Sequence, residues 1–219
     1  QLHHEHYKAG TINAIFKIGG QSGRLRAAVD HICAMAEDLV RNGHGILVIS
    51  DRQADAFHAP IPSLLSVGAI HHHLVRLGLR SQTSLVVETG DARETHHFAT
   101  LIGYGASAVN PYLTYATISD LYHKGAFGKE KSRDYYIEVY NKAIGKGLLK
   151  IMSKIGVSTL QSYQGAQIFE ALGIHRDVVD HCFTGTISRI QGIGFDGIAR
   201  ESLVRHDLAY PKQALPNPQ

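Results

Sequence analysis

Short apolar runs alternate with amphipathic segments along the first half of the chain. The runs at residues 12–16, 45–50 and 84–88 are typical of buried strands, since a strand covered on both faces by helices is apolar throughout. Between them, apolar residues recur at helical spacing. This alternation predicts right-handed βαβ units and hence a parallel sheet in an α/β fold.

The expected helices of the first half are marked by spacing and by caps. Residues 22–42 and 61–77 carry apolar side chains at helical intervals, and a glycine follows each segment. We expect Asp91 to cap a third helix, with Glu94 three residues later as in a capping box. A short fourth strand is expected at 106–110.

The second half is richer in expected helix. We predict a long helix at 132–154, a fifth strand and loop at 156–162, and three shorter helices at 165–172, 177–183 and 197–206. The fold is therefore α/β with a helix-rich C-terminal half.

The chain divides into one domain with two terminal segments. Residues 1–10 are polar and His-rich and are expected to be loosely held, 11–206 form a single α/β domain, and 207–219 contain three of the six prolines and are typical of a linker or a cut end. Two arrangements of the parallel units fit: a partial (β/α)-barrel-like sheet or an open doubly wound sheet. A closed eight-stranded barrel is disfavoured because it usually needs about 250 residues.

The charge balance, the hydropathy and the cysteine content disfavour several classes of protein. The 22 Lys and Arg and 19 Asp and Glu give a net charge of +3, without the clustered basic excess of a nucleic-acid-binding protein. No apolar run reaches the roughly 18 residues of a membrane span. Cys33 and Cys182 are far apart in sequence, and neither lies in a CxxC pair, which favours reduced thiols.

The histidine clusters are weak evidence for a metal site, and a glycine motif is weak evidence for a dinucleotide site. Histidines gather at 3–6, 71–73 and 96–97, but consecutive histidines on a helix point about 100° apart and cannot all reach one ion. We therefore predict no metal site. Gly192, Gly194 and Gly197 match the G-x-G-x-x-G motif. A dinucleotide site needs a further strand and an acidic residue after this motif, but here the chain leads into its proline-rich tail. We therefore interpret these residues as flexible turn glycines.

Polar residues at the expected strand ends are the best positional candidates for a site, because ligands of parallel α/β folds collect at the carboxyl ends of strands. The alternative, which we favour, is a structural network that caps helices and pairs Asp51 with Arg52. The candidates for a substrate path or an interdomain contact are Ser50, Asp51, Arg52, Glu88, Asn110, Ser162, Tyr163 and Gln164.

Four lysines recur every four residues on the expected long helix. This stripe is more typical of a solvated face, although it could also dock an acidic partner. It comprises Lys142, Lys146, Lys150 and Lys154. An apolar face of the same helix is expected from Val139, Ala143, Ile144, Leu148, Met152 and Ile155.

Five long stretches together resemble one family. They are GHGILVISDR at 43–52 and the segments 58–80, 84–113, 146–174 and 183–203. These motifs closely resemble the large subunit of glutamate synthase, of both the NADPH-dependent and ferredoxin-dependent kinds, from about residue 10 to residue 206. The resemblance places the chain between the N-terminal glutamine amidotransferase domain and the flavin-binding barrel, and it includes much of the central domain.

The resemblance implies that the full enzyme hydrolyses glutamine at an N-terminal Cys, channels the ammonia and adds it to 2-oxoglutarate, with reduction on FMN and an iron–sulfur cluster relaying electrons. It places none of these cofactors in this chain, because Cys33 and Cys182 cannot supply the three closely spaced cysteines of the cluster and the principal flavin-binding segments lie further on. No catalytic residue of the family is assigned to this stretch.

The expectation is thus a scaffold that is inactive alone. Its implied partners are the amidotransferase and FMN-binding domains of the same polypeptide and a small electron-donating subunit or ferredoxin. The implied location is cytoplasmic, or plastid in a photosynthetic eukaryote. Two other hypotheses remain: an autonomous (β/α)-type small-molecule enzyme and a docking module for an acidic redox partner.

Overall fold

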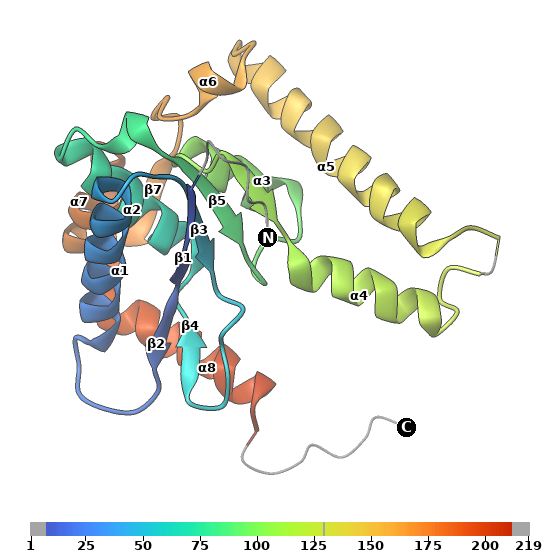
Figure 1. Cartoon of the computed structure of the whole chain (residues 1–219), viewed down its shortest axis with the longest axis horizontal. Helices are drawn as coiled ribbons and strands as arrows, with labels where there is room; N and C mark the ends of the chain where they lie inside the picture. The colour runs from blue at the N-terminus through green and yellow to red at the C-terminus, as the bar shows by residue number, and fades with distance from the viewer. Residues whose placement is uncertain (1–7, 129, 212–219) are drawn as a thin grey trace.

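A four-stranded parallel sheet forms the centre of the chain (Figure 1). The computed structural model describes residues 8–128 and 130–211. The α/β prediction is confirmed. The strands, in their spatial order, are β1 (Lys8–Asn13), β3 (His44–Ser50), β5 (Ser84–Glu88) and β6 (Ala108–Asn110).

The strand order runs in one direction, without the reversal that marks the ligand crevice of a doubly wound sheet. The connecting helices are α1 (Arg24–Arg41), α2 (Ser63–Arg76) and α3 (Thr95–Gly103). Right-handed crossovers in one direction place all three helices on the same face. The sheet is therefore open and has the arrangement of a segment of a (β/α) barrel.

Burial along the strands alternates between the two faces of the sheet. The helix-covered face buries Gly10, Ile12, Leu47, Ile49, Leu85 and Val87. On the opposite face, Thr11, Val48 and Val86 stand in one row by register and are partly or fully exposed. Within the described residues, the sheet is thus packed on one side, whereas parallel sheets are usually covered on both.

The strand expected at residues 12–16 is two strands in the structure. The chain leaves the main sheet at Ala14, whose N–H donates to the Ser50 carbonyl at 2.7 Å and whose carbonyl accepts from Ile61 N–H at 2.9 Å. It continues as β2 (Ile15–Lys17), antiparallel to β4 (His58–Pro60). A single apolar run does not reveal this change of partner.

Two long helices project from the body as a hairpin (Figure 1). They are α4 (Tyr112–His123), which the sequence pattern did not predict, and α5 (Arg133–Ile155). The expected apolar face of α5 is only partly correct. Met152 is its one buried residue, and Val139 remains 45% exposed, because the hairpin touches the body along a narrow row of residues.

The region after α5 departs most from the prediction. The strand expected at 156–162 is wrong, since the short helix α6 (Leu160–Tyr163) lies there. The helix expected at 165–172 is also wrong. Its C-terminal part belongs to β7 (Glu170–Ile174), because these residues pair with a strand 17 positions later in the chain.

A small βαβ unit ends the structure. β7 is followed by α7 (Arg176–Cys182) and by β8 (Ile187–Ile193), which is parallel to β7, and α8 (Phe195–Ala209) then packs against α1. The last two expected helices are present, although α8 is longer than 197–206.

The terminal segments overlap the domain more than expected. Residues 8–10 belong to β1, and α8 continues to Ala209. His3, His4, Glu5 and His6 lie outside the described residues, as do residues 212–219.

Candidate functional site

A row of polar side chains crosses the carboxyl ends of all four strands on the open face of the sheet. Asn13, Ser50, Glu88 and Asn110 are successive register partners. Ser50 Oγ donates to Glu88 Oε2 at 2.6 Å, and Asn110 Nδ2 donates to Glu88 Oε1 at 3.4 Å. Arg52 Nε lies 2.9 Å from Glu88 Oε1. The carboxylate of Glu88 is therefore the centre of this row.

Asp51 lies behind the row and is 5% exposed. Its carboxylate accepts from Thr89 Oγ1 at 2.8 Å and from the Gly90 N–H at 3.0 Å. Burial raises the pKa of Asp51, and these hydrogen bonds partly oppose the shift. Asp51 thus ties the end of β3 to the turn that follows β5.

The expected ion pair between Asp51 and Arg52 is wrong. Arg52 points the other way, to Glu88, and its guanidinium stacks 4.1 Å from the centre of the Tyr112 ring. Successive residues after a strand point in opposite directions, so adjacent charges do not pair here. Burial disfavours ionisation of Glu88, but hydrogen bonds from Ser50 and Arg52 outweigh it and lower the pKa of Glu88.

Five of the predicted candidates therefore come together at one edge of the sheet: Ser50, Asp51, Arg52, Glu88 and Asn110. Sequence reasoning missed Asn13 and Tyr112. Asn13 was placed inside an expected strand, and Tyr112 follows Pro111 in a helix that was not expected. An aromatic residue two positions after a strand end was the only available signal for Tyr112.

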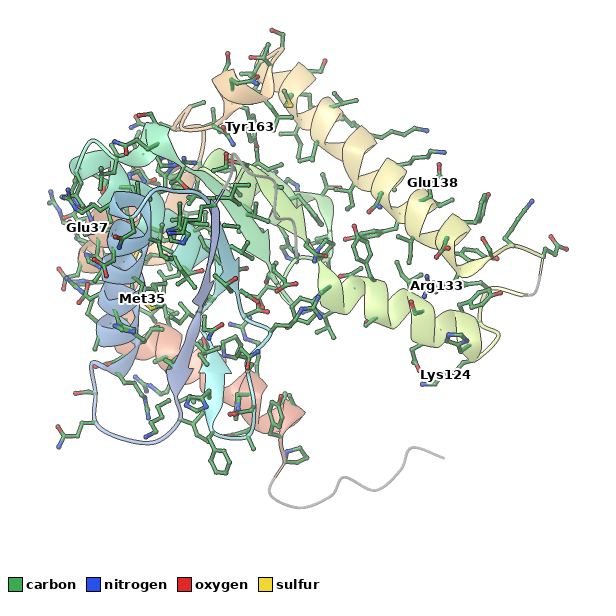
Figure 2. All side chains as sticks on the ribbon, viewed as in Figure 1. Met35, Glu37, Lys124, Arg133, Glu138 and Tyr163 are labelled. Carbon is green, nitrogen blue, oxygen red and sulfur yellow. The ribbon has the colours of Figure 1, made fainter. Side chains whose placement is uncertain are left out.

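The other three candidates, Ser162, Tyr163 and Gln164, lie elsewhere, because the strand expected before them is absent. Tyr163 is 1% exposed and donates to the Ala99 carbonyl at 3.2 Å, while Gln164 Nε2 donates to the Ala106 carbonyl at 2.7 Å. Ala106 precedes β6, so these contacts are at the amino end of that strand. Figure 2 shows Tyr163 where the projecting hairpin returns to the body.

The lysine stripe lies on the outer side of α5. The packed row of this helix consists of Tyr140, Ile144, Leu148 and Met152. Each lysine follows a member of that row by two residues, which is about 200° around the axis. Lys142 is paired at 2.8 Å with Glu138, which is labelled in Figure 2. Docking of an acidic partner on this stripe stays a prediction.

The three histidines at the end of α2 take three different partners. His71 Nδ1 accepts from Arg80 Nε at 3.0 Å, His72 lies edge-on to the Tyr104 ring, and His73 Nε2 lies 3.1 Å from Glu37 Oε2. Within the described residues, no group of three or more His, Cys, Asp and Glu side chains is placed to hold a metal ion.

Both cysteines are buried thiols. Burial raises the pKa of Cys33 to about 12 and also raises the pKa of Cys182. Such thiols form little thiolate at neutral pH and are poor nucleophiles. The expectation of reduced cysteines agrees with this arrangement.

We expect the stability of the chain to fall on mild acidification, because two histidines, His71 and His72, are partly buried. Burial lowers the pKa of His71 and of His72 to about 4, from 6.5. Between pH 6.5 and pH 4 the unfolded chain therefore binds protons that the folded chain does not, and stability is lost as the pH falls. Allowing for their partial exposure, the loss at pH 5 relative to pH 7.5 is on the order of 1 kcal/mol for each ring.

Urea unfolding of a His72→Phe variant tests this pH dependence. His72 Nε2 is buried and has no hydrogen-bond partner in the described structure, so the replacement removes a titrating group without breaking a bond. The difference in stability between pH 7.5 and pH 5 should shrink by on the order of 1 kcal/mol. An unchanged difference would contradict the prediction.

The glycine motif allows close packing of β8 against β7 and of α8 against the end of β8. Gly192 lies in β8 directly against the Gly173 backbone, so that a side chain there would clash with main-chain atoms. Gly194 caps α8, and Gly197 lies in the first turn of that helix. The motif therefore lies at a strand-to-helix junction and not in a free turn.

These features define an α/β domain with an open parallel sheet whose strand-end polar groups bond to one another. The sequence profile of the glutamate synthase central domain matches residues 1–175. The chain belongs to the glutamate synthase family and contains central-domain sequence, which confirms the resemblance seen in its motifs.

Three relatives show how much of the enzyme the chain represents. It is 45% identical over 206 residues to glutamate synthase [NADH] of Schizosaccharomyces pombe, covering 94% of this chain and 10% of that protein. It is 45% identical to the glutamate synthase [NADPH] large chain of Bacillus subtilis, covering 94% and 13%. It is 43% identical to ferredoxin-dependent glutamate synthase 1 of Arabidopsis thaliana, covering 91% and 13%. The chain thus spans only about a tenth to an eighth of these relatives.

Among the described residues, no helix has both the length and the apolarity to cross a membrane.

Proposed function

We propose that this chain is the scaffold section of a glutamate synthase, which makes L-glutamate from glutamine-derived ammonia and 2-oxoglutarate with reduction on FMN. In this proposal the section holds the amidotransferase and FMN-binding parts of the same polypeptide in place. It contributes no reacting group and is inactive alone.

The strand-end row carries the proposal. This is the position where an α/β enzyme normally binds its ligand, yet both carboxylates there already have partners within the chain: Glu88 has Ser50 and Arg52, and Asp51 has Thr89 and Gly90. A catalytic acid or base needs a free site for substrate within hydrogen-bond reach. The open face beside the row supports a contact with another part of the enzyme.

Replacing the centre of the row in the full-length enzyme tests this. We expect Glu88→Gln to leave glutamine hydrolysis and ammonia-dependent glutamate formation, measured separately, within about twofold of the parent, because the amide keeps the shape and most of the hydrogen bonds. Thr117→Ala, which removes an exposed hydroxyl bonded only to its own helix, is the matched control. A loss of about a hundredfold or more in either reaction, with an unchanged melting temperature, would show that Glu88 acts in catalysis.

A flavin titration of the 219-residue chain tests whether this chain binds FMN by itself. We expect no quenching of FMN fluorescence on addition of stoichiometric protein at micromolar concentration. Tight one-to-one binding would instead favour an autonomous flavin site in this chain. Bovine serum albumin at equal concentration controls for nonspecific quenching.

A further inference from the structure

The small parallel sheet at the C-terminal end has one covered and one uncovered face. The partners across the sheet are Glu170 with Ile187, Leu172 with Ile190, and Ile174 with Ile193. Glu170, Leu172 and Ile174 alternate and so point to one side. Two irregularities in the register of β8 bring three isoleucines spaced by three residues to that same side.

These side chains form an apolar face that the described chain leaves open. Leu172 is 63% exposed, Ile187 58%, Ile190 62% and Ile193 45%. On the opposite side, Ser188 and Gln191 face α7 residues such as Val179. The helix of this βαβ unit therefore covers only one side of the sheet.

The open side continues into a groove of about 600 Å³. The groove lies between α2, α3, the two strands and α8, and it is lined mainly by apolar side chains that include Leu64, Tyr104, Phe169 and Ile198. Glu201 and Arg205 of α8 stand at the groove, and Val204 and Leu208 of the same helix are 58% and 70% exposed. The exposed side chains of β7 and β8 thus border an apolar groove, as is typical of an interaction site.

We propose that this face, which we call the β7–β8 face and define by Leu172, Ile187, Ile190 and Ile193, is covered by the part of the same polypeptide that follows residue 219 in the full-length enzyme. The inference rests on the proposed scaffold function and adds the surface and its occupant.

The boundary of the family match supports this choice of occupant. The central-domain profile ends at residue 175, between β7 and α7, whereas similarity to whole glutamate synthases extends over 94% of the chain. The sheet therefore pairs a central-domain strand, β7, with a strand from the region after that domain. Because the sheet already contains the first strand of the following region, we expect further residues of that region to pack against it. A two-stranded parallel sheet also needs a second packed layer to be stable.

Site-specific photo-cross-linking in the full-length enzyme tests the occupant. With p-benzoylphenylalanine at position 190, we expect mass spectrometry to find adducts with peptides that follow residue 219 in the same chain. The same probe at Arg176, a residue of α7 with a side chain 75% exposed, is the control and should not yield those adducts. Adducts with upstream peptides, with a second copy or with another subunit would overturn the proposal, as would the absence of any adduct at position 190.

A charge substitution gives an independent readout. Ile190→Lys should leave the melting temperature of the 219-residue chain within about 2 °C, because the side chain is exposed there. In the full-length enzyme it should lower glutamine-dependent glutamate formation roughly tenfold or more, since a charge would be buried against the covering layer. Unchanged activity of the full-length variant would contradict the proposal.

The two proposals fail in different ways. If the scaffold function is wrong, Glu88→Gln abolishes a reaction while the cross-link at position 190 still reaches the downstream segment. If the β7–β8 face is assigned wrongly, the cross-link goes elsewhere while Glu88→Gln leaves both reactions intact.

Discussion

Gly68→Ala should destabilise the chain by about 2–3 kcal/mol, although alanine is the better helix former. Gly68 lies in α2 where that helix crosses the end of α7. An added Cβ would overlap the Cys182 carbonyl oxygen and lie 2.8 Å from Phe183 Cε1. The carbonyl belongs to the backbone of a packed helix and cannot move aside without separating the two helices. The gain in helix propensity, about 1 kcal/mol, is smaller than this clash.

The matched control is Gly145→Ala in α5. Gly145 is also helical, but its added Cβ would meet no atom within 4 Å. This variant should be more stable than the parent by about 0.5–1 kcal/mol, through backbone entropy alone. Urea unfolding at pH 7.5 measures both changes. If both substitutions stabilise the chain equally, α2 and α7 do not pack as described.

Arg80→Met should destabilise the chain by about 3 kcal/mol. The guanidinium of Arg80 donates to the Thr83 carbonyl at 2.6 Å, to the Gly105 carbonyl at 2.7 Å and to His71 Nδ1 at 3.0 Å. These bonds join the end of α2 to the loops that lead into β5 and β6. Methionine fills much of the volume but leaves two carbonyls without their donor, at about 1–3 kcal/mol each.

An exposed arginine provides the comparison for Arg80. Arg176 is paired with Asp180 on α7, and their side chains are 75% and 66% exposed, so Arg176→Met should change stability by less than about 1 kcal/mol. Arg80→Lys should restore little, because a single ammonium cannot reproduce a planar fork of donors. Thermal or urea unfolding of the three variants separates these expectations. Equal stability of Arg80→Met and Arg176→Met would contradict the role assigned to Arg80.

The candidate site shows which parts of a constellation can be predicted from sequence. Ser50 and Glu88 were correctly placed at neighbouring strand ends, because an apolar run in an α/β pattern has a recognisable end. The partner of Arg52 could not be predicted. The sequence neighbour Asp51 was the apparent choice, but the pleat turns the two side chains apart, and Asp51 instead bonds to Thr89 and Gly90.

Most of the secondary-structure errors fall after residue 110, where local signals compete with distant pairing. The segment ending at β7 has helical spacing, yet it forms a strand because β8 is available to pair with it. Likewise, α4 carries no buried residue, so it lacks the strong apolar stripe on which helix prediction depends. Its position is set by the neighbouring α5 and by Tyr112, whose ring lies against the Arg52 guanidinium.

The sequence by itself determined the α/β class, the parallel strands, the first three helices and the family, because local periodicity and long contiguous motifs carry that information. Only the tertiary structure decided that Glu88 gathers the strand-end groups and that, among the residues it describes, the main sheet is packed on one face and the β7–β8 face is exposed. Each of these depends on strand order and register between residues far apart in the chain, which no local pattern encodes.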